Sequence, residues 1–324
     1  MRAYRFSEVG TPPTVVDHPQ PAITPGHAVI QLHAGAFNRR DHWIALGKYP
    51  DLQPSTLGSD GCGTVIAGPK ESIGSAVVIC PSINWGKEER YQSRSYTILG
   101  MPTDGTFAEY ISVPVELIFH KPKHLTATQG SAFPLAGLTA WRALFTRAQL
   151  KAGDKVLITG IGGGVALFAM QFALAKGALV YVTSGSATKI ERALDMGAKG
   201  GALYTDPDWH KQLGKNFDVI IDSAGGEDFG KLVRLLGMGG RLSFYGGTLG
   251  KWPAILPQHL FFKQVSILAS TMGSPTEFGN MCQYIEKHKI VPVVDSVLSL
   301  ENAADAMKRL IHPERFGKVT LRIN

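Results

Sequence analysis

A glycine-rich turn near the middle of the chain is the segment best suited to carry chemistry. An apolar run, Val156-Leu157-Ile158, is followed directly by Thr159 and Gly160-Ile161-Gly162-Gly163-Gly164. Glycine lets a backbone approach a pyrophosphate closely, and the amides and dipole of a following helix start favour negative charge. The turn therefore predicts a dinucleotide site and, with it, hydride transfer. A tight strand-to-helix connection without a ligand also favours glycine, so the turn alone leaves both interpretations open.

The residues around the turn favour the dinucleotide interpretation. Apolar residues recur at helical spacing at Val165, Phe168 or Ala169, and Phe172. A second apolar strand, 178–183, follows at the distance that a βαβ unit requires. The turn therefore lies between two parallel strands, where nucleotide-binding turns are found.

The chain changes in character along its length. Up to about Pro122, glycine and proline break it into short β segments, with strands expected at 28–37, 63–67, 76–80 and 107–113. A helical region at 126–150 leads into alternating elements. Strands are expected there at 155–159, 178–183, 217–222, 240–245 and 265–270, with helices including 165–176 and 187–196. This alternation predicts an α/β fold with a doubly wound parallel sheet, which binds its ligand at the carboxyl ends of the strands.

The last fifty residues change pattern again. Ser274-Pro275-Thr276-Glu277 combines a helix cap, a proline at the first helical position and the glutamate of a capping box. A strand near 293–298, a helix from about 301 to 310 and a strand at 318–322 follow. We therefore assign residues 1–122 and 272–324 to a β-rich domain, and 123–271 to a nucleotide-binding domain.

The composition narrows the functional classes. The 324 residues are 44% hydrophobic and 18% charged, which is typical of a globular protein. The formal charge of +7 comes from dispersed Lys and Arg, so nucleic acid is not favoured as a partner, and a phosphorylated small molecule explains the charge as well. Cys62, Cys80 and Cys282 form no CxxC pair, which suggests a reducing compartment. No apolar run approaches the roughly 20 residues of a membrane span, so we expect a cytoplasmic protein without membrane contact.

Six short motifs, in order along nearly the whole chain, resemble the medium-chain dehydrogenase/reductase superfamily, and most closely its zinc-free quinone oxidoreductase-like branch. They are Asn38-Arg39-Arg40-Asp41, Gly47-Lys48-Tyr49-Pro50, Leu57-Gly58-Ser59-Asp60-Gly61, Ala136-Gly137-Leu138-Thr139, the glycine turn, and Phe316-Gly317-Lys318-Val319. The resemblance implies a GroES-like catalytic domain, a Rossmann NADP(H)-binding domain and hydride transfer. One departure is Ala166, which replaces the last glycine of the family's turn, a change that Rossmann fingerprints tolerate.

The resemblance also bears on zinc. Zinc-dependent members carry a Cys, a His-Glu pair and a second Cys, since the metal needs thiolate or imidazole ligands with one open position. The matching positions here are Asn38, Ser59 with Asp60, and Leu135. None of Asn, Ser or Leu replaces such a ligand. The segment 82–104, where zinc members often hold a structural site, contains no cysteine. We therefore expect no metal. Separately, we expect the segment 82–104 to be a solvated loop rather than a lid over the substrate.

The cofactor expected is NADP(H). NAD-preferring members place an acid at the end of the second strand, where this chain has Ser184. A carboxylate would repel a 2′-phosphate, whereas a hydroxyl can donate to it. The resemblance places Lys189 where NADP-using members supply a cation, and Tyr204 beside the same phosphate. A solvated turn and an exposed helix residue remain the alternatives for Ser184 and Lys189.

The rest of the cofactor site is assigned in the same way. Gly163 is expected at the closest approach to the pyrophosphate, with Gly164 and Val165 supplying helix-start amides. By resemblance, four further residues line the ribose and nicotinamide half of the site: Thr139, near the carboxamide, and Ser223, Tyr245 and Gly246. Turn chemistry explains the glycines among them as well.

Without a Lewis acid, the resemblance favours acceptors that are already activated, namely quinones and α,β-unsaturated carbonyls. Asn38 is a candidate for a hydrogen bond to ribose or to the substrate oxygen, and Tyr49 for a donor to the developing oxyanion. An aromatic wall is the alternative role for Tyr49. Asp41 is expected to orient its neighbours rather than to exchange protons.

Other functions remain open at this point. One is an alcohol dehydrogenase acting on small alcohols or aldehydes, and another is a crystallin-like NADPH-binding protein with little turnover. Relatives commonly dimerise through the last Rossmann strand, and Val265-Ser266-Ile267-Leu268-Ala269 is apolar enough for that edge. We therefore expect a homodimer, the alternative being an edge that the same chain covers.

Overall fold

The structure is a computed structural model that describes residues 1–323. The chain folds into two compact units, one formed by Met1–Leu138 with the chain from Gly273 onward, the other by Thr139–Met272. Helix α3 (Pro134–Trp141) runs from the first unit into the second. No helix among the described residues is long and apolar enough to cross a membrane.

The first unit is rich in β structure. Its strands are β1 (Arg2–Phe6), β2 (Thr14–Asp17), β3 (His27–Ala36), β4 (Ser55–Thr56), β5 (Asp60–Ala67), β6 (Ala76–Ile79), β7 (Ser82–Ile83), β8 (Thr97–Ile98), β9 (Tyr110–Pro114), β10 (Ile118–His120), β17 (Val294–Ser299) and β18 (Lys318–Arg322). Its helices are α1 (Arg39–Ala45), α2 (Ala127–Ala132), α9 (Pro275–His288) and α10 (Ala303–Ile311).

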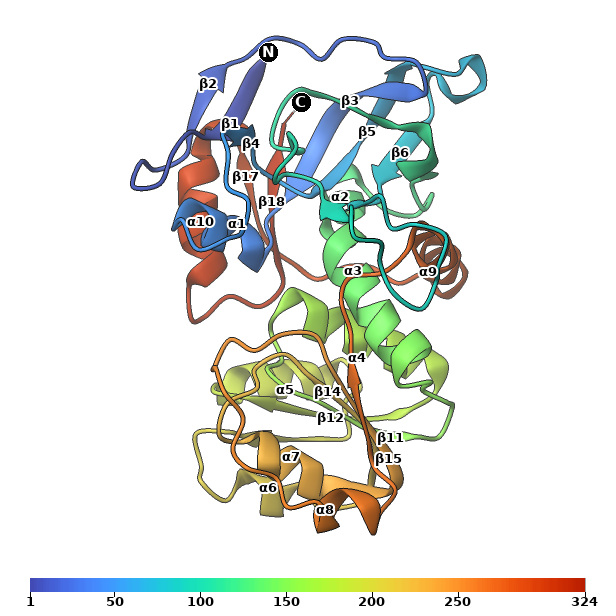
Figure 1. Cartoon of the computed structure of the whole chain (residues 1–324), viewed down its shortest axis with the longest axis vertical. Coiled ribbons are helices and arrows are strands. Elements are labelled where there is room, and N and C mark those ends of the chain that lie inside the picture. Colours follow the sequence, from blue (N-terminus) through green and yellow to red (C-terminus); the bar gives the residue numbers. More distant parts are fainter. Residues whose placement is uncertain (324) are drawn as a thin grey trace. The chain divides into compact units, whose positions relative to one another are not determined.

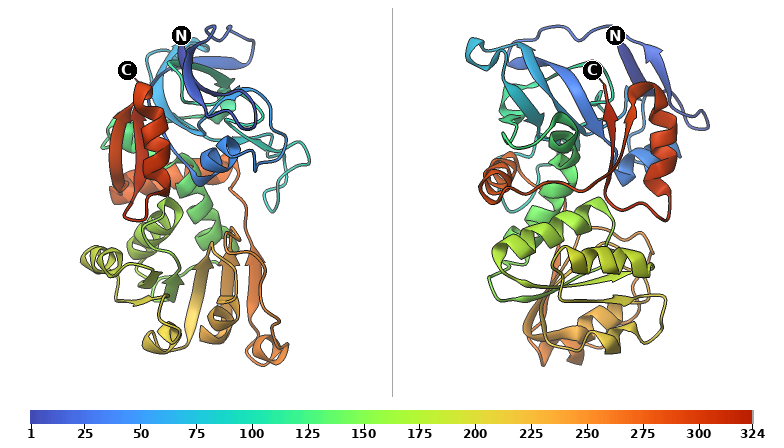
Figure 2. Two further views of the ribbon diagram at one scale, coloured as in Figure 1. Left: turned by 90° about the vertical axis from the view of Figure 1, so that its left-hand side faces the viewer. Right: turned by 180° about the vertical axis from the view of Figure 1, so that it is seen from behind.

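The main sheet of this unit joins segments from both ends of the chain. Its strand order is β10-β6-β5-β3-β18-β17, and β9 also pairs with β3. As expected, the chain's last strand returns to the β-rich part, because β18 pairs antiparallel with β3. Helix α10 lies beside β17 and β18 (Figure 2). The buried core includes Phe37 and Phe107, whose ring centroids are 4.4 Å apart.

The second unit has the predicted doubly wound architecture. Its strands are β11 (Lys155–Ile158), β12 (Leu179–Ser184), β13 (Gly200–Leu203), β14 (Phe217–Asp222), β15 (Leu236–Phe244) and β16 (Ser266–Ala269). The helices are α4 (Gly164–Lys176), α5 (Ala187–Asp195), α6 (Trp209–Gln212), α7 (Phe229–Leu235) and α8 (Gln258–Phe261). All strands are parallel, in the order β13-β12-β11-β14-β15-β16, and the central ones lie side by side in Figure 1.

Some predicted elements need correction. The helical region expected at 126–150 is divided into α2, α3 and a π-helical segment, Arg142–Arg147. Strand β9 begins at Tyr110, three residues later than expected, and β15 begins at Leu236, four residues earlier. The helix start at Ser274 is confirmed, with the Ser274 hydroxyl accepting from Glu277 N and Glu277 accepting from Ser274 N. Signals confined to one turn were therefore reliable, and strand ends were less so.

Candidate functional site

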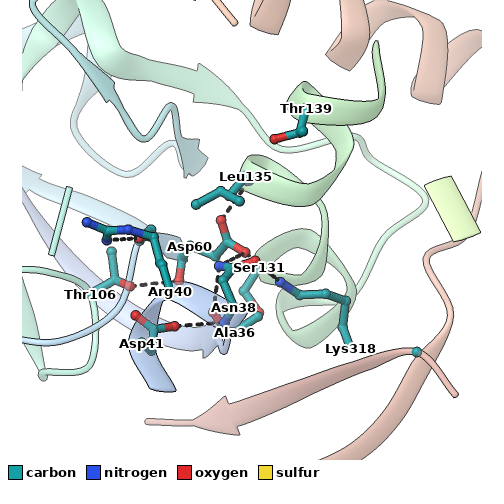
Figure 3. A network of polar contacts seen from close by, with 12 residues as sticks. Ala36, Asn38, Arg40, Asp41, Asp60, Thr106, Ser131, Leu135, Thr139 and Lys318 are labelled. Atoms are coloured by element: carbon teal, nitrogen blue, oxygen red, sulfur yellow. Dashed lines mark hydrogen bonds and ion pairs between the residues drawn. The ribbon is translucent and has the colours of Figure 1, made fainter. Parts of the chain in front are cut away.

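The register of the main sheet brings three polar residues to one place. Asp60 of β5 and Thr320 of β18 both pair with Ala36, the last residue of β3. Asn38 lies two residues beyond Ala36, and Lys318 two residues before Thr320. The two antiparallel pairings therefore place Asn38, Asp60 and Lys318 together, and Figure 3 shows these side chains pointing toward one another.

Asp60 is the centre of this group. Its Oδ2 accepts from Lys318 Nζ at 2.9 Å and from Asn38 Nδ2 at 2.9 Å, and its Oδ1 accepts from Leu135 N at 2.7 Å. Asn38 Oδ1 accepts from Lys318 Nζ at 2.7 Å. Asp60 is completely buried and Lys318 is 3% exposed. Every carboxylate and ammonium contact here is made inside the unit, so this is a tightly held buried ion pair.

Asn38 and Asp41 meet at the start of helix α1. Asn38 N donates to Asp41 Oδ2 at 2.7 Å, so the carboxylate fixes the backbone that carries Asn38. This contact suits the orienting role predicted for Asp41. The Asn38 amide is 7% exposed and engaged on both of its polar atoms. Its predicted hydrogen bond to ribose or substrate would therefore have to replace one of these contacts, and it stays a prediction.

Asp41 also has an unsatisfied oxygen atom. Its Oδ1 is buried without a hydrogen-bond partner among residues 1–323. Burial raises the pKa of Asp41 to about 6, although the neighbouring Arg40 guanidinium and the Asn38 N–H act to lower it. A carboxyl with this pKa changes its charge close to neutral pH.

Arg40, which precedes Asp41 in the chain, forms a second group with Tyr49 and Ser59. Its Nε donates to Tyr49 Oη at 3.2 Å, and its Nη1 donates to Ser59 Oγ at 2.6 Å. Arg40 is 8% exposed, whereas Tyr49 is half-buried. The predicted catalytic residues thus fall into two hydrogen-bonded groups, one with Asn38 and Asp41 and the other with Tyr49, in which Arg40 is the link between Tyr49 and Ser59.

The donor set at this place does not suit zinc. The positions that match the family's ligands hold an amide, a hydroxyl and an aliphatic side chain, and the carboxylate beside them is paired with Lys318. Zinc sites in proteins use thiolate, imidazole and carboxylate ligands. Among residues 1–323, no three His, Cys, Asp or Glu side chains come together in a way that could hold a metal ion. A lysine ammonium also repels a cation, so the side chains at these positions do not fit zinc.

The glycine turn lies at the start of α4 in the second unit. Gly160 and Gly162 have φ of +68° and +108°, which side chains rarely tolerate. A Cβ added to Gly163 would meet only Gly160 O, at 3.6 Å, and one added to Gly160 would meet nothing within 4 Å. The turn is held by Thr159 Oγ1, which donates to Asp222 Oδ1 at 2.6 Å. Open space in front of a fixed turn fits a pyrophosphate.

Three residues predicted to read the 2′-position lie near the end of β12. Tyr204 N donates to Ser184 O at 3.0 Å, and a Cβ on Gly185 would lie 2.8 Å from Tyr204 Oη. Tyr204 is 48% exposed, and Lys189 lies partly exposed on α5. Ser184 is 3% exposed, and its hydroxyl accepts from Ser186 N at 3.2 Å. A contact between Ser184 and a phosphate would therefore need its hydroxyl to turn outward.

The residues predicted for the nicotinamide half follow β14 and β15. Tyr245 N donates to Asp222 O at 3.0 Å, and a Cβ on Gly246 would lie 2.7 Å from Ser223 O. Burial raises the pKa of Tyr245, and a hydrogen bond with Ser223 opposes the shift. Ser223, Tyr245 and Gly246 are therefore neighbours. Thr139 is 6% exposed, and its hydroxyl lies 3.7 Å from Met272 Sδ.

Residues 84–95 are mostly exposed, as expected of a solvated loop, but the segment 82–104 also has buried and anchored residues. Trp85 is 2% exposed and contacts Tyr96 edge to face, with ring centroids 5.4 Å apart. Glu89 accepts from Ser274 Oγ at 2.5 Å and from Thr276 Oγ1 at 2.9 Å, at the start of α9. The burial of Trp85 and the hydrogen bonds of Glu89 with α9 were not expected, because no local signal in the sequence shows them.

Sequence reasoning missed the roles of Arg40 and Lys318. Both stood inside motifs that were noted for resemblance alone. The local signal at Lys318 is its place at the start of an apolar strand, which does not by itself indicate burial, since Lys155 has the same place in β11 and is partly exposed. No such signal pointed to the contacts of Arg40, since its partners lie in distant turns.

Comparison with family models agrees with this architecture. Residues 24–123 match the model described as alcohol dehydrogenase GroES-like domain, and residues 164–287 match the model described as zinc-binding dehydrogenase. The GroES-like and Rossmann-like parts of the expected fold are thereby confirmed, in a mixed α/β chain.

Similar proteins cover nearly the whole chain. A zinc-type alcohol dehydrogenase-like protein YogA of Leptosphaeria maculans is 36% identical, over 92% of this chain and 90% of its own length. The quinone oxidoreductase of Mus musculus is 30% identical, over 99% of this chain and 97% of its own. Among solved structures, an NAD-dependent alcohol dehydrogenase has a TM-score of 0.93 at 36% identity, with 100% of both chains covered.

Proposed function

Because the chain belongs to the medium-chain dehydrogenase/reductase superfamily, we propose that it is an NADPH-dependent reductase of quinones or α,β-unsaturated carbonyls that needs no catalytic zinc. At the coarser level the protein is an oxidoreductase of this family. The substrate class and the cofactor preference are the proposal.

The observation that carries the proposal is the buried contact of Lys318 with Asp60 and Asn38. By the family resemblance, Asn38 and Asp60 stand at positions where zinc-dependent members carry metal ligands, and neither is a thiolate or an imidazole. Without a Lewis acid, an isolated carbonyl is a poor hydride acceptor, because its oxygen must take the charge unaided. A conjugated acceptor spreads that charge, so hydrogen bonds from the protein are enough.

The glycine turn supports a nicotinamide dinucleotide. When bound, the dinucleotide supplies the hydride. Gly163 leaves space for the pyrophosphate, and the amides of Gly164 and Val165 at the start of α4 favour its charge. Asp222 holds the turn by accepting from Thr159 Oγ1 and, at 2.9 Å, from Gly225 N. These contacts support a preorganised site.

The proposed NADPH preference rests on the end of β12, where no carboxylate occurs from Ser184 to Lys189. Lys189 and Tyr204 would contact the 2′-phosphate. We expect Lys189→Ala to weaken NADPH binding about tenfold and NADH binding hardly at all, because a charge-assisted hydrogen bond is lost only with NADPH. Titration of protein fluorescence with each dinucleotide measures both affinities. Equal losses for the two cofactors would count against the assignment.

The two polar groups support the proposed catalytic roles. Tyr49 would donate to the carbonyl oxygen as it gains charge, Asp41 holds the backbone of Asn38, and Asn38 would face ribose or substrate once one of its present contacts is replaced. Thr139, Ser223, Tyr245 and Gly246 are proposed to line the nicotinamide half of the site.

The test is NADPH oxidation by protein pretreated with a chelator, using a quinone, a conjugated enone and a saturated aldehyde as acceptors. We expect turnover with the first two, unchanged by the chelator. Turnover confined to the saturated aldehyde, or lost after chelation, would reject the proposal.

A second candidate is an alcohol dehydrogenase-like activity, favoured by the 36% identity to an NAD-dependent alcohol dehydrogenase. The same assay separates it, since that candidate predicts alcohol oxidation with NAD. Tight NADPH binding without turnover of any acceptor would instead support the crystallin-like alternative. We further propose that the protein forms a homodimer through β16.

A further inference from the structure

Arg40 is a buried cation that the proposed chemistry has not yet used. Besides Tyr49 and Ser59, its guanidinium donates to Leu99 O at 2.8 Å and to Met101 O at 3.2 Å. Three of its contacts fix the planar group in one orientation, and the fourth is to Tyr49. The guanidinium therefore has a fixed edge, Nε, directed at the Tyr49 hydroxyl.

The contact has a consequence for Tyr49. The guanidinium carbon lies 4.8 Å from the centre of the Tyr49 ring, and Oη accepts the Nε hydrogen bond. A phenol that accepts at oxygen keeps its own O–H hydrogen for another acceptor. Accepting from a cation also polarises the phenol, so the O–H becomes a stronger donor. Within residues 1–323, the hydrogen bonds found for Oη come from Arg40 alone.

Ser59, at one of the positions that match the zinc ligands of the family, contacts Arg40. Its Oγ accepts from Arg40 Nη1 and donates to Leu99 O at 2.8 Å. Ser59 stands where zinc-dependent members have a histidine ligand. In this chain Ser59 instead holds the Arg40 guanidinium. A fixed cation therefore contacts Tyr49, the candidate donor.

We propose that Arg40 is a positioning residue that aims and polarises the Tyr49 hydroxyl toward the oxygen of a conjugated carbonyl substrate. The inference rests on the proposed function and deepens it. The hydride would come from NADPH, which would be oxidised to NADP⁺. As the conjugated carbon gains its C–H bond, the electron pair would move to the carbonyl oxygen, which would accept the Tyr49 hydrogen bond. A proton from water, leaving hydroxide to the solvent, would complete the product. The site thus favours substrates whose oxygen becomes an enolate or a quinol anion.

The first experiment is a double-mutant cycle on binding, so that it needs no turnover. 4-Nitrophenolate, an anionic oxygen on a conjugated ring, is titrated into protein saturated with NADP⁺ and followed by its absorbance. We expect Tyr49→Phe and Arg40→Gln each to weaken binding about tenfold, and the double variant to be no weaker than Tyr49→Phe, because Arg40 acts through the lost hydroxyl. Losses that multiply, or wild-type protein that does not bind the probe, would overturn the proposal.

The second experiment uses turnover. With an enone acceptor, both single variants should lose kcat by about tenfold to a hundredfold with a much smaller change in KM, because the contact strengthens as charge develops. If wild-type protein turns over but Tyr49→Phe keeps its kcat, the Arg40 inference fails and the proposed function stands. If nothing turns over while the binding cycle shows coupling, the proposed function fails alone.

Structural damage is controlled separately. Arg309→Gln removes another arginine of this unit, whose Nε donates to Asp295 at 2.7 Å, and should leave nitrophenolate binding unchanged. Arg40→Lys keeps the charge without the planar fork and should restore part of the affinity. If Arg40→Gln does not fold, Ser59→Ala loosens the guanidinium while Arg40 and Tyr49 stay. It should weaken probe binding less than Tyr49→Phe, and an unchanged affinity would contradict the inference.

Discussion

Among single side chains, four buried charged residues of the β-rich unit have the clearest consequences. Arg40 and Lys318 are matched in charge by Asp41 and Asp60, and all four are less than a tenth exposed. Burying one of these charges alone would be costly, so each depends on the others. The two carboxylates differ, however. Asp60 has partners on both oxygens, whereas Asp41 Oδ1 has none in the described chain.

Asp41 should make stability depend on pH. Its pKa is raised from 3.8 to about 6 in the folded protein, so the folded state binds the proton more tightly than the unfolded state. Its contribution therefore lowers the free energy of unfolding by about 2 kcal/mol as pH rises from about 4 to about 7. Asp41→Asn keeps an acceptor for Asn38 N and removes the pH-dependent contribution of the carboxyl.

The measurement is urea unfolding of both proteins across that pH range. Taking the difference between the variant and the wild type cancels all shared titrating groups. We expect Asp41→Asn to have its largest stability advantage, relative to wild type, near neutral pH, and to lose about 2 kcal/mol of that difference toward pH 4. A difference that stays constant with pH would show that Asp41 is not the titrating group.

Lys318 should be required for folding stability. Lys318→Met leaves the Asp60 carboxylate buried without its cation, which costs about 3–5 kcal/mol in such pairs. Urea unfolding measures the loss, and the double variant with Asp60→Asn should recover part of it. Lys308→Met, which breaks the exposed pair with Asp305, is the matched control and should change little. Similar effects at the two lysines would contradict the importance given to the buried pair.

Helix α4 shows how one element separates stability from binding. It begins after Gly163, which has φ of −75°, and ends at Gly177, which has φ of +84°. Alanine is allowed at the first position, where the added methyl would enter the open space before the turn. At Gly177 alanine is strained, because a positive φ brings the Cβ too close to the backbone.

The two glycines should therefore respond in opposite ways. Gly163→Ala should weaken NADPH binding about tenfold or more, by displacing the pyrophosphate from the helix amides, with less than about 1 kcal/mol of stability lost. Gly177→Ala should lose about 1 kcal/mol or more of stability and bind NADPH normally. Dinucleotide titration and thermal unfolding of both variants provide the check. Unchanged NADPH affinity in Gly163→Ala would remove the turn from the proposed site.

At the scale of the whole molecule, the exposed edge of the parallel sheet matters most. Strand β16 pairs only with β15 among the described strands. Ser270 N donates to Phe244 O, so by the alternation of a strand Ile267 and Ala269 turn their backbone groups away from β15. Arg147 Nε occupies Ala269 O at 2.8 Å. The outward groups of Ile267 are the ones best placed to pair with a second copy.

Ile267→Pro tests the proposed homodimer. Proline removes an outward N–H without disturbing the pairing with β15, so the protomer should keep its fold while association is lost. Sedimentation velocity should show a dimer for the wild type and a monomer for the variant, with circular dichroism unchanged. A wild-type monomer would refute the dimer, and a variant that still dimerises would place the interface elsewhere.

The sequence by itself determined the features that depend on neighbours within a few residues. The glycine turn with its βαβ unit, the capping box at Ser274 and the alternation that produces a parallel sheet were all predicted correctly. Each is fixed by backbone sterics or by hydrogen bonds inside one turn, and local sequence encodes such terms. The named motifs also pointed to Asn38, Asp41 and Tyr49, whose functions remain predictions.

Only the tertiary structure decided which buried charges are paired and which residues pair with them. Lys318 and Asp60 are separated by 258 positions in the chain, and Arg40 is fixed by the carbonyls of Leu99 and Met101, in a segment expected to be solvated. The energy of a buried charge depends on the sum of its partners from every strand and turn packed around it, and that sum exists only once the chain has folded.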